Sequence, residues 1–205
     1  MFSNTLEILE DLKKGKIVCI ADSEDVENEI DMMCLGKFAT PENVNFMITN
    51  AKGLVCVPMG YDYAISHGFK KMDIESFSED VRQTPFCQPV DLKACLTGIS
   101  ATERSMTIRH LANKDNKPDD FISFGHVFTL IARKGLLEER QGHTEASVFL
   151  ASLVDKNSPV ATICEIIKDN GEMLRVGDFE EWNKNKHLKI CHIDNLVTSY
   201  KYLEV

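Results

Sequence analysis

Residues 16 to 31 read KIVCIADSEDVENEID, an apolar run that passes directly into an acidic run. The first part, Lys16 to Ala21, has the continuous apolar pattern of a buried strand. The second part, Asp22 to Asp31, carries these carboxylates within ten residues: Asp22, Glu24, Asp25, Glu27, Glu29 and Asp31. We therefore expect an acidic loop that leaves the end of a strand.

This density of like charge costs folding energy unless a cation neutralises it. Carboxylate oxygens suit magnesium, which takes one or two carboxylates and completes its octahedral shell with water and substrate oxygens. A solvated acidic loop explains the same residues, because charge runs usually face solvent. Taken alone, the acidic run favours the solvated loop, so a metal site needs support from elsewhere in the chain.

Helical and strand patterns alternate along the rest of the chain. Asn4 and Glu7 form a capping pair before an amphipathic helix that stops at Gly15, and Thr40-Pro41 begins another that runs to Ala51. Further helices are expected at Ser100 to Leu111, from Thr144 or Glu145 onward, at Phe179 to Asn185 and at Asp194 to Tyr202, and strands at Leu54 to Met59, His126 to Ala132, Val160 to Ile167 and Lys189 to His192. This alternation predicts a layered α+β or α/β fold.

Two long polar stretches, Tyr61 to Leu92 and Asn113 to Ser123, resist assignment and are interpreted as functional lids or surface excursions. With 205 residues, 43% hydrophobic positions and no internal repeat, the chain predicts one domain spanning residues 1–205.

Charge and cysteine content restrict the partners. A net charge of -9 argues against a nucleic-acid surface, and no run of about 18 apolar residues could span a bilayer. The polar, acidic start from Met1 to Leu12 is unlike a secretion signal. Seven cysteines without a C-x-x-C pair are typical of small buried hydrophobes in a reducing compartment and offer no zinc framework. We expect a cytoplasmic protein with a small-molecule partner.

Two other segments carry groups suited to chemistry. Arg140 to Ala146 (RQGHTEA) places a cation, a glycine, His143 and a hydroxyl at a predicted helix start, which is an anion-binding arrangement. The alternative is that Thr144 only caps the helix. Glu165 lies in an apolar strand, so its pKa is expected to rise and the residue is a candidate general acid or base, although strand alternation could equally turn it to water.

Five segments stand in a fixed order along the chain: Asp22-Ser23-Glu24-Asp25-Val26-Glu27-Asn28-Glu29-Ile30-Asp31, Gly53-Leu54-Val55-Cys56, Thr97-Gly98-Ile99-Ser100-Ala101, Arg140 to Ala146, and Cys164-Glu165-Ile166 followed by Gly171-Glu172-Met173-Leu174-Arg175. Over nearly its whole length the chain thus resembles the 3,4-dihydroxy-2-butanone-4-phosphate synthase family, whose acidic loop has the form D-D-E-D-R-E-N-E-G-D and whose helix start reads R-x-G-H-T-E-A. The resemblance implies a mixed sheet flanked by helices and a homodimer with sites near the subunit interface.

The resemblance also implies a reaction. Ribulose 5-phosphate is enolised and rearranged, and one carbon leaves as formate, with magnesium (or manganese) polarising the oxygens. It assigns Glu27 and His143 to the metal; Asp31, Arg140, Gln141, Gly142, Thr144 and Cys56 to substrate binding; His126 and Glu165 to catalysis; and Glu24 and Asp25 as additional acid or base candidates.

The chain departs from the family pattern at these positions: Ser23, Val26, Ile30, Ser123, Phe124 and Phe149. Val26 stands where the family has an arginine that reaches the substrate, and Ile30 replaces a glycine that can adopt a positive φ. Three hypotheses follow: the synthase itself, an enzyme that enolises a different phosphorylated or carboxylated ketose, and a non-catalytic sugar-phosphate binder. We rank the synthase first because the groups that carry the reaction survive, and Lys70 or Lys71 could replace the lost cation.

Overall fold

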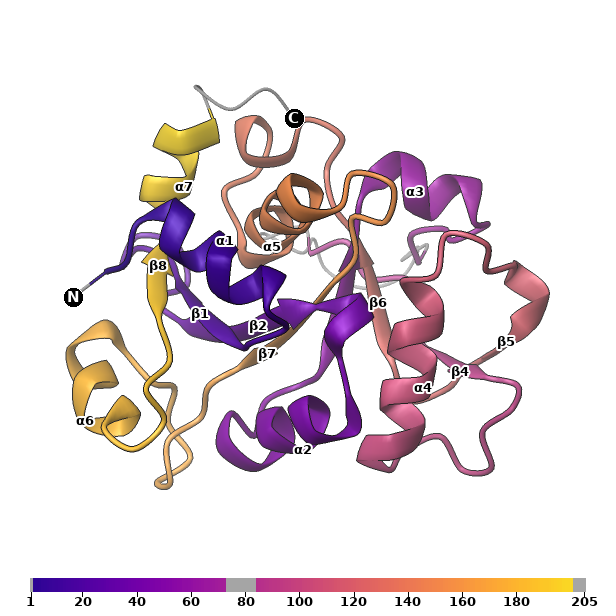
Figure 1. Ribbon diagram of the computed structural model, residues 1–205, viewed down its shortest axis with the longest axis horizontal. Coiled ribbons are helices and arrows are strands. Elements are labelled where there is room, and N and C mark those ends of the chain that lie inside the picture. The colour runs from indigo at the N-terminus through magenta and orange to yellow at the C-terminus, as the bar shows by residue number, and fades with distance from the viewer. Residues whose placement is uncertain (1, 73–83, 201–205) are drawn as a thin grey trace.

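The computed structural model describes residues 2–72 and 84–200 and contains one six-stranded sheet, in the order β6-β3-β7-β2-β1-β8, and a two-stranded ribbon, β4-β5 (Figure 1). The strands are β1 Val18–Ala21, β2 Ile30–Leu35, β3 Cys56–Met59, β4 Val90–Leu92, β5 Phe121–Ser123, β6 Phe128–Ile131, β7 Ala161–Glu165 and β8 Ile190–His192. The α-helices are α1 Thr5–Lys13, α2 Pro41–Asn50, α3 Tyr61–Ser66, α4 Ala101–Leu111, α5 His143–Val154, α6 Phe179–Asn183 and α7 Ile193–Tyr200.

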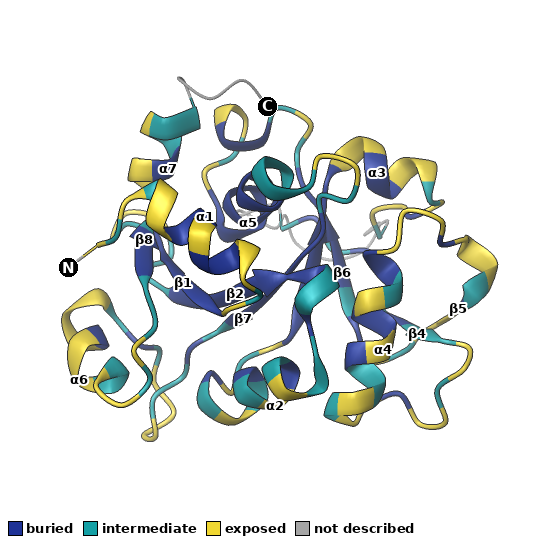
Figure 2. Cartoon of the chain, in the orientation of Figure 1, coloured by how far each residue is buried: buried dark blue, intermediate teal, exposed yellow. Residues whose placement is uncertain are grey.

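The sheet is mixed, as the family resemblance implies. β1 pairs with β8 and β3 with β6 in parallel, whereas β1 with β2, β2 with β7 and β3 with β7 are antiparallel. Helices cover both faces, so the strands are buried on both sides. Figure 2 shows the buried sheet between partly exposed helices.

Two apolar clusters occupy the two faces of the sheet. On one face, Val18 and Ile20 of β1 pack with residues of α1, α5 and α7. On the other, Cys19 and Ala21 pack with residues of α2 and α4. Successive strand residues thus alternate between the clusters, as the pleat of a strand requires.

β1 and β2 form a hairpin around the acidic residues, with Ala21 opposite Ile30. The sequence predicts a loop through Asp31, and this is wrong for its last two residues, because β2 begins at Ile30. Ile30 is fully buried in an extended strand. Replacing a glycine by Ile30 was expected to strain a backbone with positive φ. In the extended strand this strain does not arise.

Local sequence rules account for most helix starts. Asn4 and Glu7 form the predicted capping box, and Thr40 caps α2 with Pro41 in its first turn. α5 begins at His143, slightly earlier than predicted, with Gly142 at the N-cap. Thr144 therefore does not cap this helix. α3, β4 and β5 lie in the two stretches without a predicted element, and Tyr202 and residues 73–83 fall outside the described residues.

Six cysteines are buried free thiols and Cys95 is partly exposed, which confirms that most serve as small apolar groups. Among the described residues, no helix is both long and apolar enough to cross a membrane.

Candidate metal and anion site

The acidic loop is held in shape from both sides. Asp22, which is buried, accepts hydrogen bonds from the backbone N–H groups of Glu27 at 2.8 Å and Glu29 at 2.7 Å. From the other side, Arg175 donates through Nη1 to the carbonyl oxygens of Glu27, at 3.0 Å, and Asn28. Four contacts thus fix the backbone around Glu27 and thereby position the Glu27 side chain.

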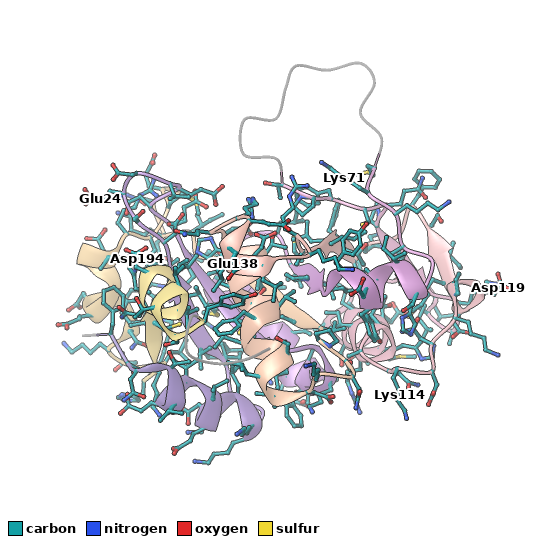
Figure 3. All side chains as sticks on the ribbon, turned by 90° about the horizontal axis from the view of Figure 1, so that it is seen from above. Glu24, Lys71, Lys114, Asp119, Glu138 and Asp194 are labelled. Carbon is teal, nitrogen blue, oxygen red and sulfur yellow. The ribbon has the colours of Figure 1, made fainter. Side chains whose placement is uncertain are left out.

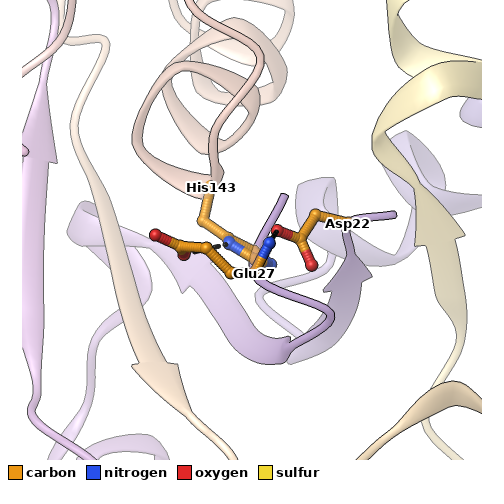
Figure 4. A group of neighbouring side chains, drawn as sticks. All are labelled: Asp22, Glu27 and His143. Atoms are coloured by element: carbon orange, nitrogen blue, oxygen red, sulfur yellow. Dashed lines mark hydrogen bonds and ion pairs between the residues drawn. The ribbon is translucent and has the colours of Figure 1, made fainter. Parts of the chain in front are cut away.

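His143, the first residue of α5, meets this loop (Figure 4). Its Nδ1 lies 3.8 Å from Oε2 of Glu27. One ligand atom each from Asp22, Glu27 and His143 lie within 4.8 Å of one another. The predicted proximity of Glu27 and His143 is therefore confirmed, across more than 100 residues of chain.

The donor set fits a divalent cation. Within the described residues, the buried Nε2 of His143 has no hydrogen-bond partner, and neither has Oδ1 of buried Asp31. Orphaned buried polar atoms are costly, so such atoms are expected to face an ion, water or ligand. Both oxygens of Asp22 already accept backbone hydrogen bonds, which makes it a residue that shapes the loop more than a ligand.

The electrostatics also favour a cation. Burial by itself lowers the pKa of His143, but the charges of Asp31 and Glu27 outweigh burial and raise this pKa to about 9. Burial, with help from the charge of Glu165, raises the pKa of Asp31 to about 7. Burial and the charge of Glu27 likewise raise the pKa of Glu29. A bound cation would relieve this repulsion and displace the proton from the imidazole.

The loop and α5 border a pocket of about 170 Å³. It is lined by Glu27, Glu29, Asp31, Cys56, Thr84, Phe86, Leu130, Arg140, His143, Thr144, Ile163 and Glu165. Seven of the predicted site residues are in this lining: Glu27, Asp31, Cys56, Arg140, His143, Thr144 and Glu165. Larger pockets lie elsewhere, such as one of about 550 Å³ beside Trp182. Charged residues that line that pocket already form ion pairs, such as Lys52 with Asp169.

Strand pairing places Glu165 in the pocket. β2 and β7 set Asp31 directly opposite Glu165, and both residues line the same space. Oε2 of Glu165 accepts a hydrogen bond from the backbone N–H of Leu54 at 2.8 Å. Of the two orientations that the sequence leaves open, the pocket-facing one is correct. Cys56 lies beside it as a thiol, because burial and then the charge of Glu165 raise the pKa of Cys56 well above its ordinary value.

Arg140 borders the pocket at the start of α5. Its Nη1 lies 2.6 Å from Oε2 of Glu145, which is fully buried. Gly142 gives α5 no side-chain cap. Without such a cap, the first backbone N–H groups of this helix can donate to another acceptor, and the positive end of the helix dipole favours an anion there.

Five predicted residues do not line this pocket. Glu24 and Asp25 are exposed on the acidic loop, and Figure 3 shows Glu24 at the periphery of the molecule. Gln141 is exposed before α5. His126 lies two residues before Phe128 of β6, and Phe128 pairs with the pocket residue Cys56. His126 is therefore near the pocket but does not line it. Gly142 is buried as the N-cap.

The departures from the family pattern do not form pocket walls. Phe149 is fully buried and packs edge-on against Tyr200, with 5.1 Å between the ring centroids. Ile30 is also in the core. Phe124 is 81% exposed, and Ser123 ends β5. Val26 is exposed on the acidic loop. None of these residues lines the pocket, so none of them changes its walls in favour of a different substrate.

Sequence reasoning gave no role to Asp22, Glu29, Arg175 or Asp91. Their contacts are long-range: Arg175 reaches the acidic loop across 148 residues, and Asp91 reaches His126 across 35. The only sequence signal was that Asp22, Glu29 and Arg175 stand inside the quoted motifs.

Comparison with known proteins gives a consistent result. Residues 6–199 match the family model described as 3,4-dihydroxy-2-butanone 4-phosphate synthase. A protein of that name from Wolinella succinogenes is 44% identical over 93% of this chain and 54% of its own length, and the riboflavin biosynthesis protein RibBA of Bacillus cytotoxicus is 42% identical over 100% of this chain and 51% of its own. The chain spans about half the length of these curated relatives. A synthase crystallised with two magnesium ions has a TM-score of 0.90 and 29% identity, with 98% of both chains covered.

Proposed function

Because this chain belongs to the 3,4-dihydroxy-2-butanone 4-phosphate synthase family, we propose that it converts D-ribulose 5-phosphate to 3,4-dihydroxy-2-butanone 4-phosphate and formate, as a step of riboflavin biosynthesis. One observation carries the proposal: Glu27, His143, Asp31 and Glu165 border a single pocket at the start of α5. This set joins metal ligands, a hydroxyl acceptor, an acid or base and an anion site in one place.

Glu27 and His143 hold the metal in this account, with Asp22 and Arg175 fixing the loop that carries Glu27. The cation, magnesium or manganese, supplies electrostatic stabilisation for the negative oxygen that develops on enolisation. The magnesium-bound relative supports magnesium as the cation.

The substrate phosphate lies at the N-terminus of α5. Thr144 adds a hydroxyl donor and Arg140 a cation, with Gln141 and Gly142 completing the segment. Asp31 accepts from the sugar hydroxyls, and the Cys56 thiol borders them. Arg140 is already paired with Glu145, so the guanidinium is held in place before the phosphate arrives.

Glu165 and His126 carry the proton transfers. Enolisation needs a base to remove a proton, and the rearranged skeleton needs an acid to return one. Glu165 stands inside the pocket for one of these steps. Glu24 and Asp25, on the outer part of the acidic loop, remain additional acid or base candidates.

We also propose a homodimer. Four large apolar side chains in the β4-β5 ribbon and the segments that follow its two strands are exposed: Leu96 (96%), Phe124 (81%), Ile99 (51%) and Ile122 (51%). Large exposed apolar groups close together are typical of an interaction surface, and a second copy of the chain would bury them beside His126. Sedimentation velocity is expected to give a species of twice the chain mass that Phe124→Glu converts to monomer. A monomeric wild type at all concentrations would contradict this.

The free, mostly buried thiols support a reducing, cytoplasmic setting for this enzyme.

A different ketose as substrate remains the second candidate because Val26 stands where the family has an arginine. Val26→Arg tests it. The new guanidinium would extend from an exposed position on the loop beside the metal ligands. A charge-assisted hydrogen bond is worth about 1.5 to 3 kcal/mol, so kcat/KM for ribulose 5-phosphate is expected to rise roughly ten- to hundredfold. Formate release by both proteins is measured side by side, and no gain or a loss in Val26→Arg would favour a different ligand.

A further inference from the structure

Asp91 of β4 holds His126 at two points. Its Oδ1 accepts a hydrogen bond from the backbone N–H of His126 at 2.9 Å, and its Oδ2 lies 2.7 Å from the ring Nδ1. The β4-β5 ribbon brings the two residues together, since Val90 pairs with Ser123 and also bridges to Val127. The imidazole is therefore fixed both by its backbone and by its ring.

Two glycines make room for this contact. A Cβ built on Gly125 would meet the Asp91 Cγ at 2.6 Å, and one built on Gly98 would meet Asp91 Oδ1 at 2.7 Å. Real Cβ atoms do not approach this closely, and Gly98 also has a φ of +80°. Gly98 belongs to the quoted segment Thr97 to Ala101, and Gly125 directly precedes His126. Both glycines lie against the Asp91 carboxylate.

The carboxylate decides which ring nitrogen carries the proton. An ionised carboxylate only accepts hydrogen bonds, so Nδ1 of His126 is the donor. In the neutral ring Nε2 is then bare. No residue within 2–72 and 84–200 donates to Nε2, and 43% of the side chain is exposed. The ring thus presents a free lone pair to an incoming molecule.

We propose that Asp91 is the positioning residue for His126, holding Nδ1–H against the protein and keeping Nε2 as the proton acceptor. This inference rests on the proposed function, which gives His126 a proton transfer. A proton passes from the substrate to Nε2, the electron pair stays on the substrate as the enediolate, and the Asp91 charge stabilises the resulting imidazolium. The same Nε2 then returns the proton.

The chain offers an internal comparison. His110 and Asp120 form a similar pair, with Nε2 2.8 Å from Oδ2, at the end of α4. There Asp120 also accepts from the backbone N–H of Lys117, and the ring packs edge-on against Phe121. That pair joins structural elements away from the pocket. Asp120→Asn is therefore a matched control for the same substitution at Asp91.

Asp91→Asn is the decisive variant because the orientation of the new side-chain amide is predictable. The backbone N–H of His126 needs an acceptor, so the Asn oxygen faces it and the amide nitrogen faces the ring. The ring must then accept at Nδ1 and carry its proton on Nε2. We expect kcat to fall by on the order of 10² to 10⁴ with KM changed only a few-fold. Thermal unfolding and the activity of Asp120→Asn are expected to stay close to wild type.

Nitrogen-15 NMR of the histidine rings supplies a readout that needs no activity. Wild type is expected to show His126 as the Nδ1–H tautomer and Asp91→Asn as the Nε2–H tautomer. A wild-type Nε2–H ring, or unchanged kcat in a folded Asp91→Asn with the inverted tautomer, would overturn the inference. If wild type releases no formate, the proposed function fails, while the tautomer measurement still decides whether Asp91 sets the state of His126.

Discussion

Glu27→Gln is expected to abolish magnesium-dependent formate release while leaving the protein folded. The substitution removes the charged ligand 3.8 Å from His143 but keeps the backbone N–H that binds Asp22. Loss of a ligand weakens the electrostatic stabilisation that the cation supplies, so kcat/KM is expected to fall by at least about 10³. Removing one charge from the acidic loop also relieves repulsion, and the free energy of unfolding of the metal-free protein is expected to stay level or rise.

Two assays check this prediction. Formate release is measured at rising magnesium concentration, and metal binding is followed directly by the Mn²⁺ electron paramagnetic resonance signal. Glu10→Gln, an exposed change on α1, is the control. If Glu27→Gln keeps wild-type Mn²⁺ affinity, Glu27 is not a ligand and the assignment of the acidic loop is wrong.

Glu165→Gln is expected to lower kcat by on the order of 10² to 10⁴ with little change in KM. Gln keeps an oxygen that can accept from the backbone N–H of Leu54, so the local structure is retained. It cannot take up or release a proton in the reaction. Glu172→Gln, an exposed carboxylate in the segment that follows β7, serves as the control for loss of charge. A Glu165→Gln enzyme with wild-type kcat would assign the proton transfer to other groups.

Local patterns explain why much of the fold was predictable. The capping box at Asn4, the Thr40-Pro41 start and the apolar strand before the acidic loop depend on neighbouring residues, and the structure contains all three elements. β4 and β5 were missed because each is only three residues long and gains its place by pairing across about 30 residues. β2 was not predicted, because its first residues Ile30 and Asp31 end the acidic run and buried Asp31 reads as a loop residue.

The site residues likewise fall into two groups, those that local motifs reveal and those that only long-range contacts reveal. Glu27, His143 and Glu165 were identifiable because they stand in motifs, and the structure brings them to one pocket. The residues that hold them were not identifiable. Arg175 and Asp91 act through contacts that depend on strand order and pairing, which a single sequence does not reveal.

Whether the chain is a synthase is decided by incubating the purified protein with ribulose 5-phosphate and measuring formate and the four-carbon phosphate ester together. We predict that the two products form in equal amounts with magnesium, that chelation stops both, and that added magnesium restores them. A folded chain that binds Mn²⁺ yet releases no formate from ribulose 5-phosphate would contradict the account.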